Sequence, residues 1–228
     1  MNGPGIMSPM AKKIGVILSG CGVYDGAEIH EAVLTLLALD RRGAEAVVCA
    51  PDAPQMHVVD HLSGKVEEGA SRNVLVESAR IARGAIRDLA TVKADELDGL
   101  VLPGGYGAAK NLCDFAVAGA SCTAHPEVAR LVREVHAQGK PVAALCIAPA
   151  VVARVLGSEK PKLTIGTDQA TAKGLEAMGA EHVACGVAQL AIDRGKKLVS
   201  TPAYMLGKRI SEVAEGIDKA VAALVEMA

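Results

Sequence analysis

The chain has 228 residues, half of them hydrophobic, and its 24 basic and 26 acidic residues give a formal net charge of -2. This balance and an aromatic content of 2% argue against a nucleic-acid-binding protein. No apolar run approaches the roughly 18 residues of a membrane span, and the start lacks a secretion signal, so we expect a cytoplasmic protein.

Residues 1–11 carry no periodic pattern, and we interpret them as a leader segment. We expect this leader to be flexible and residues 12–228 to form a single domain. The first strand is IGVILSG, residues 14–20, and a helical pattern follows over residues 27–43. Asp25 and Glu28 resemble a capping box at its start, with Glu28 the better candidate for the cap.

The remaining elements alternate between short aliphatic strands and helices. Residues 57–65 are expected to form a small strand and turn, and residues 72–89 a helix. Further strands are predicted at residues 45–51, 97–105, 141–146, 163–168, 176–186 and 197–202, and further helices at 126–138, from Pro149, and at 208–227. This alternation predicts an α/β protein: a flavodoxin-like, doubly wound, mostly parallel sheet with helices on both faces.

The carboxyl ends of such strands are where ligands bind, and Cys146 is predicted at one of them. The helix that starts near Pro149 directs its free N–H groups and positive dipole end toward the sulfur, which favours a thiolate. The alternative is a buried structural cysteine that acts only as a small hydrophobe. Both interpretations stay open on local sequence alone.

Other candidate groups follow neighbouring strands. Gly104 and Gly105 allow backbone N–H groups to approach an oxyanion. Taken alone, this stretch is better explained as a plain glycine turn, and the oxyanion role gains weight only together with the thiol at the neighbouring strand end. Glu31 lies early in the first helix and becomes a proton shuttle if it is enclosed near Cys146, or else stays a solvated carboxylate. We predict that the substrate contacts a second set of residues that follow these strands: Gly104, Tyr106, Asn111, Tyr24 and Cys21. Tyr204 also follows a strand, so the three tyrosines are candidates to line a shared pocket. The alternative is that each ring packs against the protein while its hydroxyl stays in water.

The six cysteines are too scattered for a zinc site, and the six histidines have no spacing that marks a base or a ligand. We therefore expect no metal site. The thiols are expected to be reduced, with Cys21 as the second reactive candidate after Cys146.

Six motifs in register carry a family resemblance: SGCGVYDGAEIHEA, RNVLVESARIARG, PGGYGAAKNL, CIAPA, TIGTD and TPAYM. From about Lys12 to the C-terminus the chain resembles the ElbB-type glyoxalases of the PfpI-like, class I glutamine-amidotransferase-like superfamily. The resemblance implies a nucleophilic Cys146, an acidic partner at Glu31, and oxyanion donors at Gly105 and Ile147. It also implies a homodimer and a cofactor-independent conversion of glyoxal, a small dicarbonyl, to glycolate.

One position departs from the family pattern. Several relatives carry a histidine about one strand beyond the cysteine, where this sequence has Gly166. An amide's leaving amine needs a proton donor of that kind, whereas an aldehyde has no leaving group, so glutaminase and protease chemistry are disfavoured. A redox-sensing or regulatory protein with an oxidisable Cys146, for instance one that influences isoprenoid biosynthesis, is the alternative hypothesis. A third is an amidotransferase-like subunit that serves a partner.

Overall fold

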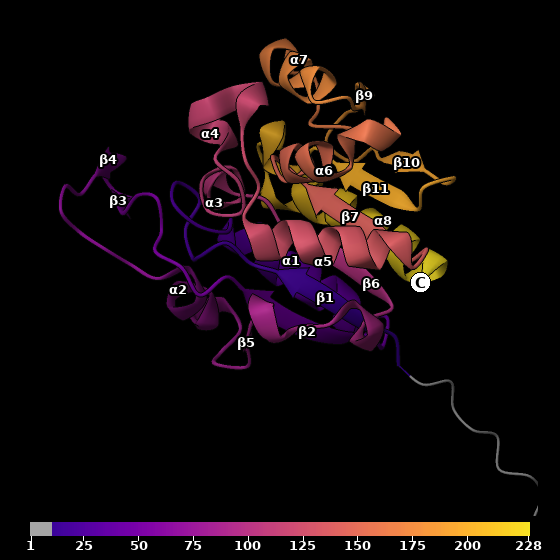
Figure 1. Cartoon of the computed structure of the whole chain (residues 1–228), viewed down its shortest axis with the longest axis horizontal. Helices are drawn as coiled ribbons and strands as arrows, with labels where there is room; N and C mark the ends of the chain where they lie inside the picture. The colour runs from indigo at the N-terminus through magenta and orange to yellow at the C-terminus, as the bar shows by residue number, and fades with distance from the viewer. Residues whose placement is uncertain (1–10) are drawn as a thin grey trace, which may run out of the picture.

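The computed structural model describes residues 11–228, so most of the predicted leader lies outside the described residues. Its centre is a seven-stranded sheet with strand order β10-β11-β7-β6-β1-β2-β5 (Figure 1). All neighbouring strands are parallel except the pair of β10 and β11. This confirms the flavodoxin-like prediction. The strands are β1 (Lys13–Ile17), β2 (Glu45–Ala50), β5 (Arg87–Asp88), β6 (Gly99–Leu102), β7 (Val142–Leu145), β10 (Ala191–Asp193) and β11 (Leu198–Thr201).

Helices cover both faces of the sheet, and the alternation of side chains along β7 shows how. Val142 and Ala144 belong to one core cluster together with α5 and α6, whereas Ala143 and Leu145 belong to a second cluster with α1 and α8. Successive strand residues point to opposite faces, so a fully apolar strand needs cover on both sides. The helices are α1 (Ile29–Asp40), α2 (Val74–Ile81), α3 (Tyr106–Lys110), α4 (Phe115–Ala118), α5 (Pro126–Ala137), α6 (Pro149–Leu156), α7 (Gln169–Ala177) and α8 (Ile210–Met227).

The start of α1 is fixed by Glu28 alone. Its Oε2 accepts the Glu31 N–H at 2.7 Å, as expected for the cap, and this bond sets the direction of the first helical turn. The predicted capping box with Asp25 is wrong, because the Asp25 carboxylate instead accepts the N–H of Val59. The cap matters for function, since it fixes the backbone of Glu31.

The predicted helix over residues 72–89 is too long. Helix α2 ends at Ile81, and Arg83 and Gly84 then take positive φ angles of 54° and 83°. Such left-handed residues terminate helices, and the chain after them becomes the short edge strand β5. The end of this segment therefore extends the sheet.

Two predicted strands lie outside the central sheet. Strand β8 (Lys162–Leu163) pairs with β9 (Glu181–His182) in a separate two-stranded sheet. The predicted strand and turn at residues 57–65 is confirmed as β3 (Val59–Asp60) and β4 (Lys65–Val66), a hairpin that projects beyond α2 in Figure 1. Strand β10 and helices α3, α4 and α7 were not predicted. No helix within residues 11–228 combines the length and apolarity of a membrane span.

Candidate functional site

Cys146 occupies the sharp turn between β7 and α6. Its φ is +57°, a left-handed conformation that costs a non-glycine residue about 1–3 kcal/mol. The Cys146 N–H donates to the Thr201 carbonyl at 3.0 Å, which ties the turn to the end of β11. The surrounding sheet thus holds the thiol in a strained position at the carboxyl ends of the strands.

Glu31 is completely buried in the first turn of α1. One carboxyl oxygen, Oε2, accepts the Gly104 N–H at 2.9 Å, and the other, Oε1, accepts the Tyr204 N–H at 3.1 Å. The carboxyl therefore joins the loops that follow β6 and β11 to the start of α1. It is not the solvated carboxylate of the alternative interpretation.

The Cys146 thiol and the Glu31 carboxyl lie beside each other, and each shifts the pKa of the other. Gly104 permits this approach, because a Cβ at that position would lie 2.7 Å from Glu31 Oε2 and 3.0 Å from Cys146 Sγ. The N–H groups of Gly105 and Ile147 face the sulfur and lower its pKa. Both predicted oxyanion donors therefore point at the place where a carbonyl oxygen on this sulfur would develop charge.

The protonation of this pair differs from the sequence-based expectation. Burial raises the pKa of Glu31 to about 7. Burial, and then the charge of Glu31, raise the pKa of Cys146 well above its ordinary value, although the N–H groups of Gly105 and Ile147 lower it. The prediction that the helix end favours a thiolate is thus outweighed by desolvation. Because the charge of Glu31 raises the pKa of Cys146, the thiol ionises more readily when Glu31 is uncharged.

A cavity of about 350 Å³ opens over the sulfur. Four predicted residues line it: Gly105, Tyr106, Cys146 and Ile147. Tyr204 lines it as well, as the position after the last strand suggested, and so do residues that were not predicted, among them Glu28, Phe115, Thr171 and Met205. Cys146 is 7% exposed, so a small molecule reaches it only through this cavity.

Four predicted substrate-binding residues lie outside the cavity lining, and one of them, Gly104, contacts Glu31 instead. The Asn111 amide donates to the carbonyls of Ser19 and Asp25 at 2.8 Å each, which is a structural role. Tyr24 packs on His61 with ring centroids 5.0 Å apart, in place of facing the sulfur. Cys21 lies near charged side chains of α2, and burial raises its pKa. A loop position after a strand does not reveal which way its side chain points, so sequence alone gave no signal against them.

No histidine belongs to the cavity lining. Gly166, at the family's histidine position, has φ of +96°, and a Cβ there would lie 2.8 Å from the Leu206 side chain. The backbone and Leu206 together exclude a larger residue. His30 is the histidine that reaches the site indirectly, through a hydrogen bond of 2.8 Å between its Nδ1 and the Tyr204 hydroxyl.

The remaining cysteines show no comparable chemistry. All six thiols in residues 11–228 are free, as expected, and Cys49, Cys113, Cys122 and Cys185 are buried. In the same part of the chain, no group of three or more metal-ligating side chains is placed to hold an ion.

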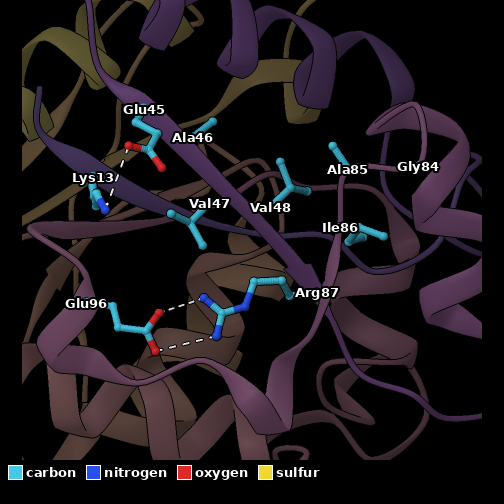
Figure 2. Close-up of a pocket in the computed structure, with 10 residues that line it drawn as sticks. All are labelled: Lys13, Glu45, Ala46, Val47, Val48, Gly84, Ala85, Ile86, Arg87 and Glu96. Carbon is cyan, nitrogen blue, oxygen red and sulfur yellow. Dashed lines mark hydrogen bonds and ion pairs between the residues drawn. The ribbon is translucent and has the colours of Figure 1, made fainter.

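A second cavity, of about 440 Å³, lies far from this chemistry between β2 and the segment that leads into β5 (Figure 2). Its charged side chains neutralise one another: Lys13 lies 3.9 Å from Glu45, and Arg87 lies 2.6 Å from Glu96. Neither a cysteine nor a histidine lines it. The cavity over Cys146 is therefore the candidate active site.

Comparison with known proteins gives the same family by sequence and by structure. A sequence model of the DJ-1/PfpI family matches residues 21–189. The human "Glutamine amidotransferase-like class 1 domain-containing protein 3, mitochondrial" is 46% identical over 95% of this chain and 84% of its own length. The zebrafish "ES1 protein, mitochondrial" is 33% identical over 84% of this chain and 76% of its own length.

Two solved structures extend the comparison. The Ehrlichia chaffeensis "isoprenoid biosynthesis protein with amidotransferase-like domain" is 39% identical, with a TM-score of 0.89 over 95% of this chain and 99% of its own. Drosophila melanogaster DJ-1beta shares the fold, with a TM-score of 0.58 and 22% identity over 95% of this chain and 91% of its own.

The expectation of a cytoplasmic protein is contradicted, because the human, rat and zebrafish relatives are all named as mitochondrial proteins. A missing secretion signal argues only against export, and it does not separate the cytosol from an organelle. The family itself is clear from the matched region and the shared fold: the chain belongs to the DJ-1/PfpI family of the class I glutamine-amidotransferase-like superfamily.

Proposed function

We propose that the protein is a cofactor-independent glyoxalase of the ElbB type, which converts glyoxal and water to glycolate. The observation that carries the proposal is the Cys146 thiol, which lines a small cavity and has the buried Glu31 carboxyl beside it. A nucleophilic thiol, a buried acid with a pKa of about 7 and two backbone N–H donors are the groups that this reaction requires.

The first step forms a bond between sulfur and carbon. Cys146 Sγ adds to one aldehyde carbon of glyoxal, and the thiol proton passes through Glu31 to the carbonyl oxygen, which gives a hemithioacetal. The N–H groups of Gly105 and Ile147 hold the oxygen while it carries negative charge. Glu31 is suited to this exchange because its pKa of about 7 lets it give and take a proton near neutrality.

The second step moves hydrogen within the bound substrate. Glu31 gives its proton to the remaining aldehyde oxygen and takes the proton from the carbon bonded to sulfur, which leaves an enediol. It then protonates the neighbouring carbon and takes back the hydroxyl proton of the carbon bonded to sulfur. The product is a thioester of glycolate on Cys146, with no net oxidation or reduction of the two-carbon unit. Water then adds to the thioester carbon, the C–S bond breaks, and the thiol is restored.

The test is glycolate formation from ¹³C-labelled glyoxal, followed by NMR. The wild type is expected to produce glycolate, Cys146→Ser to produce none, and Cys49→Ser, which removes a buried thiol far from the cavity lining, to keep the rate. Wild-type and Cys146→Ser proteins with equal rates would overturn the proposal.

A second candidate is a redox-sensing or regulatory protein. The observation in its favour is the same contact, because a protonated Glu31 would donate a hydrogen bond to a sulfinate formed on Cys146 by peroxide. The Ehrlichia relative is named an isoprenoid biosynthesis protein, which supports a role near that pathway for this candidate. Selective oxidation of Cys146 under mild peroxide, seen by mass spectrometry, together with negligible glycolate formation would favour this candidate.

Amidotransferase chemistry finds less support, because the cavity lining offers no histidine to protonate a leaving amine. The homodimer stays a prediction, and sedimentation equilibrium of the full chain measures it.

A further inference from the structure

The side chain of Tyr204 lies between the cavity and solvent. Tyr204 lines the cavity over Cys146, and its hydroxyl lies 2.8 Å from His30 Nδ1. The His30 side chain is 54% exposed. Tyr204 thus joins the cavity lining, through its hydroxyl, to an imidazole in contact with water.

The backbone of Tyr204 fixes the start of this connection. Its N–H donates to Glu31 Oε1 at 3.1 Å, so the residue that carries the hydroxyl is also anchored to the buried acid. The other charged group that faces the pair is Glu28, whose Oε1 lies 4.0 Å from His30 Nδ1. Glu28 is held in place by its capping bond to the Glu31 N–H.

The proposed reaction requires such a connection. Glycolic acid is ionised at neutral pH, so each conversion of glyoxal and water to glycolate releases one proton. Glu31 has no contact with solvent of its own, because it is completely buried and both of its oxygens accept backbone N–H groups. A proton taken up in the cavity must leave by a polar group on the cavity wall.

We propose that Tyr204 and His30 form the proton exit of the active site. The Tyr204 hydroxyl exchanges protons with the water and the oxygens of the bound intermediate. His30 positions that hydroxyl and takes its proton. The inference rests on the proposed glyoxalase function. In each cycle the hydroxyl passes its proton to unprotonated His30 Nδ1, accepts one from the attacking water, and His30 releases its proton to solvent. Burial and the charges of Glu28 and Glu31 raise the pKa of Tyr204, which keeps the hydroxyl protonated at rest.

The chain contains a matched control. Tyr24 and His61 form a second tyrosine–histidine pair, with ring centroids 5.0 Å apart against 5.8 Å for Tyr204 and His30. Neither Tyr24 nor His61 lines the cavity over Cys146. A general effect of removing a hydroxyl or an imidazole should appear in both pairs, whereas loss of a proton exit should appear in one.

The experiment compares Tyr204→Phe and His30→Gln with Tyr24→Phe and His61→Gln in the glycolate assay. Tyr204→Phe keeps the ring and the N–H that holds Glu31, so we expect kcat to fall about tenfold or more with little change in KM. His30→Gln should lower kcat similarly, the double variant should be no slower than Tyr204→Phe, and the control variants should match the wild type. Unchanged kcat in Tyr204→Phe, or additive losses in the double variant, would overturn the proton exit.

A second readout does not depend on turnover. If the pair is coupled to the cavity, the pH dependence of Cys146 alkylation by iodoacetamide should shift in Tyr204→Phe and His30→Gln but not in Tyr24→Phe. A wild type that makes no glycolate but shows this shift would reject the glyoxalase and retain the coupled pair. An alkylation profile that is the same in all variants would reject the pair as a proton path, whatever the turnover.

Discussion

The Cys146 thiol lies beside the carboxyl of Glu31, which is itself held by two backbone N–H groups. Burial raises the pKa of both groups, and the charge of Glu31 raises the pKa of Cys146 further, whereas Cys146 lowers the pKa of Glu31. The pair is therefore best described as a thiol and an acid that exchange a proton. The predictions below follow from this coupling and from the glycine that permits it.

Replacement of Glu31 by glutamine should separate reactivity of the sulfur from turnover. The Glu31 charge raises the pKa of Cys146, so Glu31→Gln should lower that pKa and speed alkylation by iodoacetamide near neutral pH. The same variant should slow glycolate formation by about 10²–10⁴-fold, because the proton shuttle is lost. Parallel changes in both rates would contradict the proposed roles. Glu134→Gln, which removes an exposed carboxylate of α5, is a suitable control.

The stability of the protein should decrease between about pH 4.5 and about pH 7 through Glu31. Its pKa is raised in the folded state from 4.5 to about 7, so the folded protein binds more protons than the unfolded chain in this window. Stability from this group is fully present below the unfolded pKa and is lost as pH rises through the folded pKa, with an upper bound of about 3 kcal/mol. Urea unfolding at about pH 5 and about pH 8 should show a smaller difference for Glu31→Gln than for wild type.

Substitution of Gly104 by alanine should disturb the active pair directly. The new Cβ would lie 2.7 Å from Glu31 Oε2 and 3.0 Å from Cys146 Sγ, so the thiol and the carboxyl must move apart. We expect a loss of about 1–3 kcal/mol in the free energy of unfolding and a marked fall in glycolate formation. Gly195→Ala is the matched control, because the nearest atom to its Cβ is 3.7 Å away. Equal activities of the two variants would show that close approach at Gly104 is unnecessary.

Introduction of a histidine at position 166 should not create amidase activity. Gly166 has φ of +96°, and Leu206 lies 2.8 Å from the site of a Cβ, so Gly166→His strains the backbone and displaces Leu206. Thermal unfolding should show a destabilisation of about 1–3 kcal/mol. A stable variant that hydrolyses glutamine would refute this interpretation of the departure from the family pattern.

The fold was predictable because its strands and helices alternate and its central strands are fully apolar. The end of α2 was not, because the left-handed turn at Arg83 and Gly84 depends on how β5 meets the sheet edge. Of the site, Cys146 and Glu31 were identified from strand-end position and family motifs. The pKa of Cys146 was misjudged, since a helix end is visible in sequence whereas the extent of burial is not. Asn111 was misassigned for a similar reason: its three hydrogen bonds join loops that are distant along the chain.

The positive φ of Cys146 also affects which amino acid would make this turn most stable. Glycine adopts that backbone conformation without a penalty, so Cys146→Gly should unfold at a higher temperature than Cys146→Ala despite having fewer atoms to pack. The cysteine side chain thus lowers the stability of this turn, and the same backbone conformation directs it into the cavity. At position 146 the proposed chemistry requires cysteine, whereas a higher unfolding temperature would favour glycine.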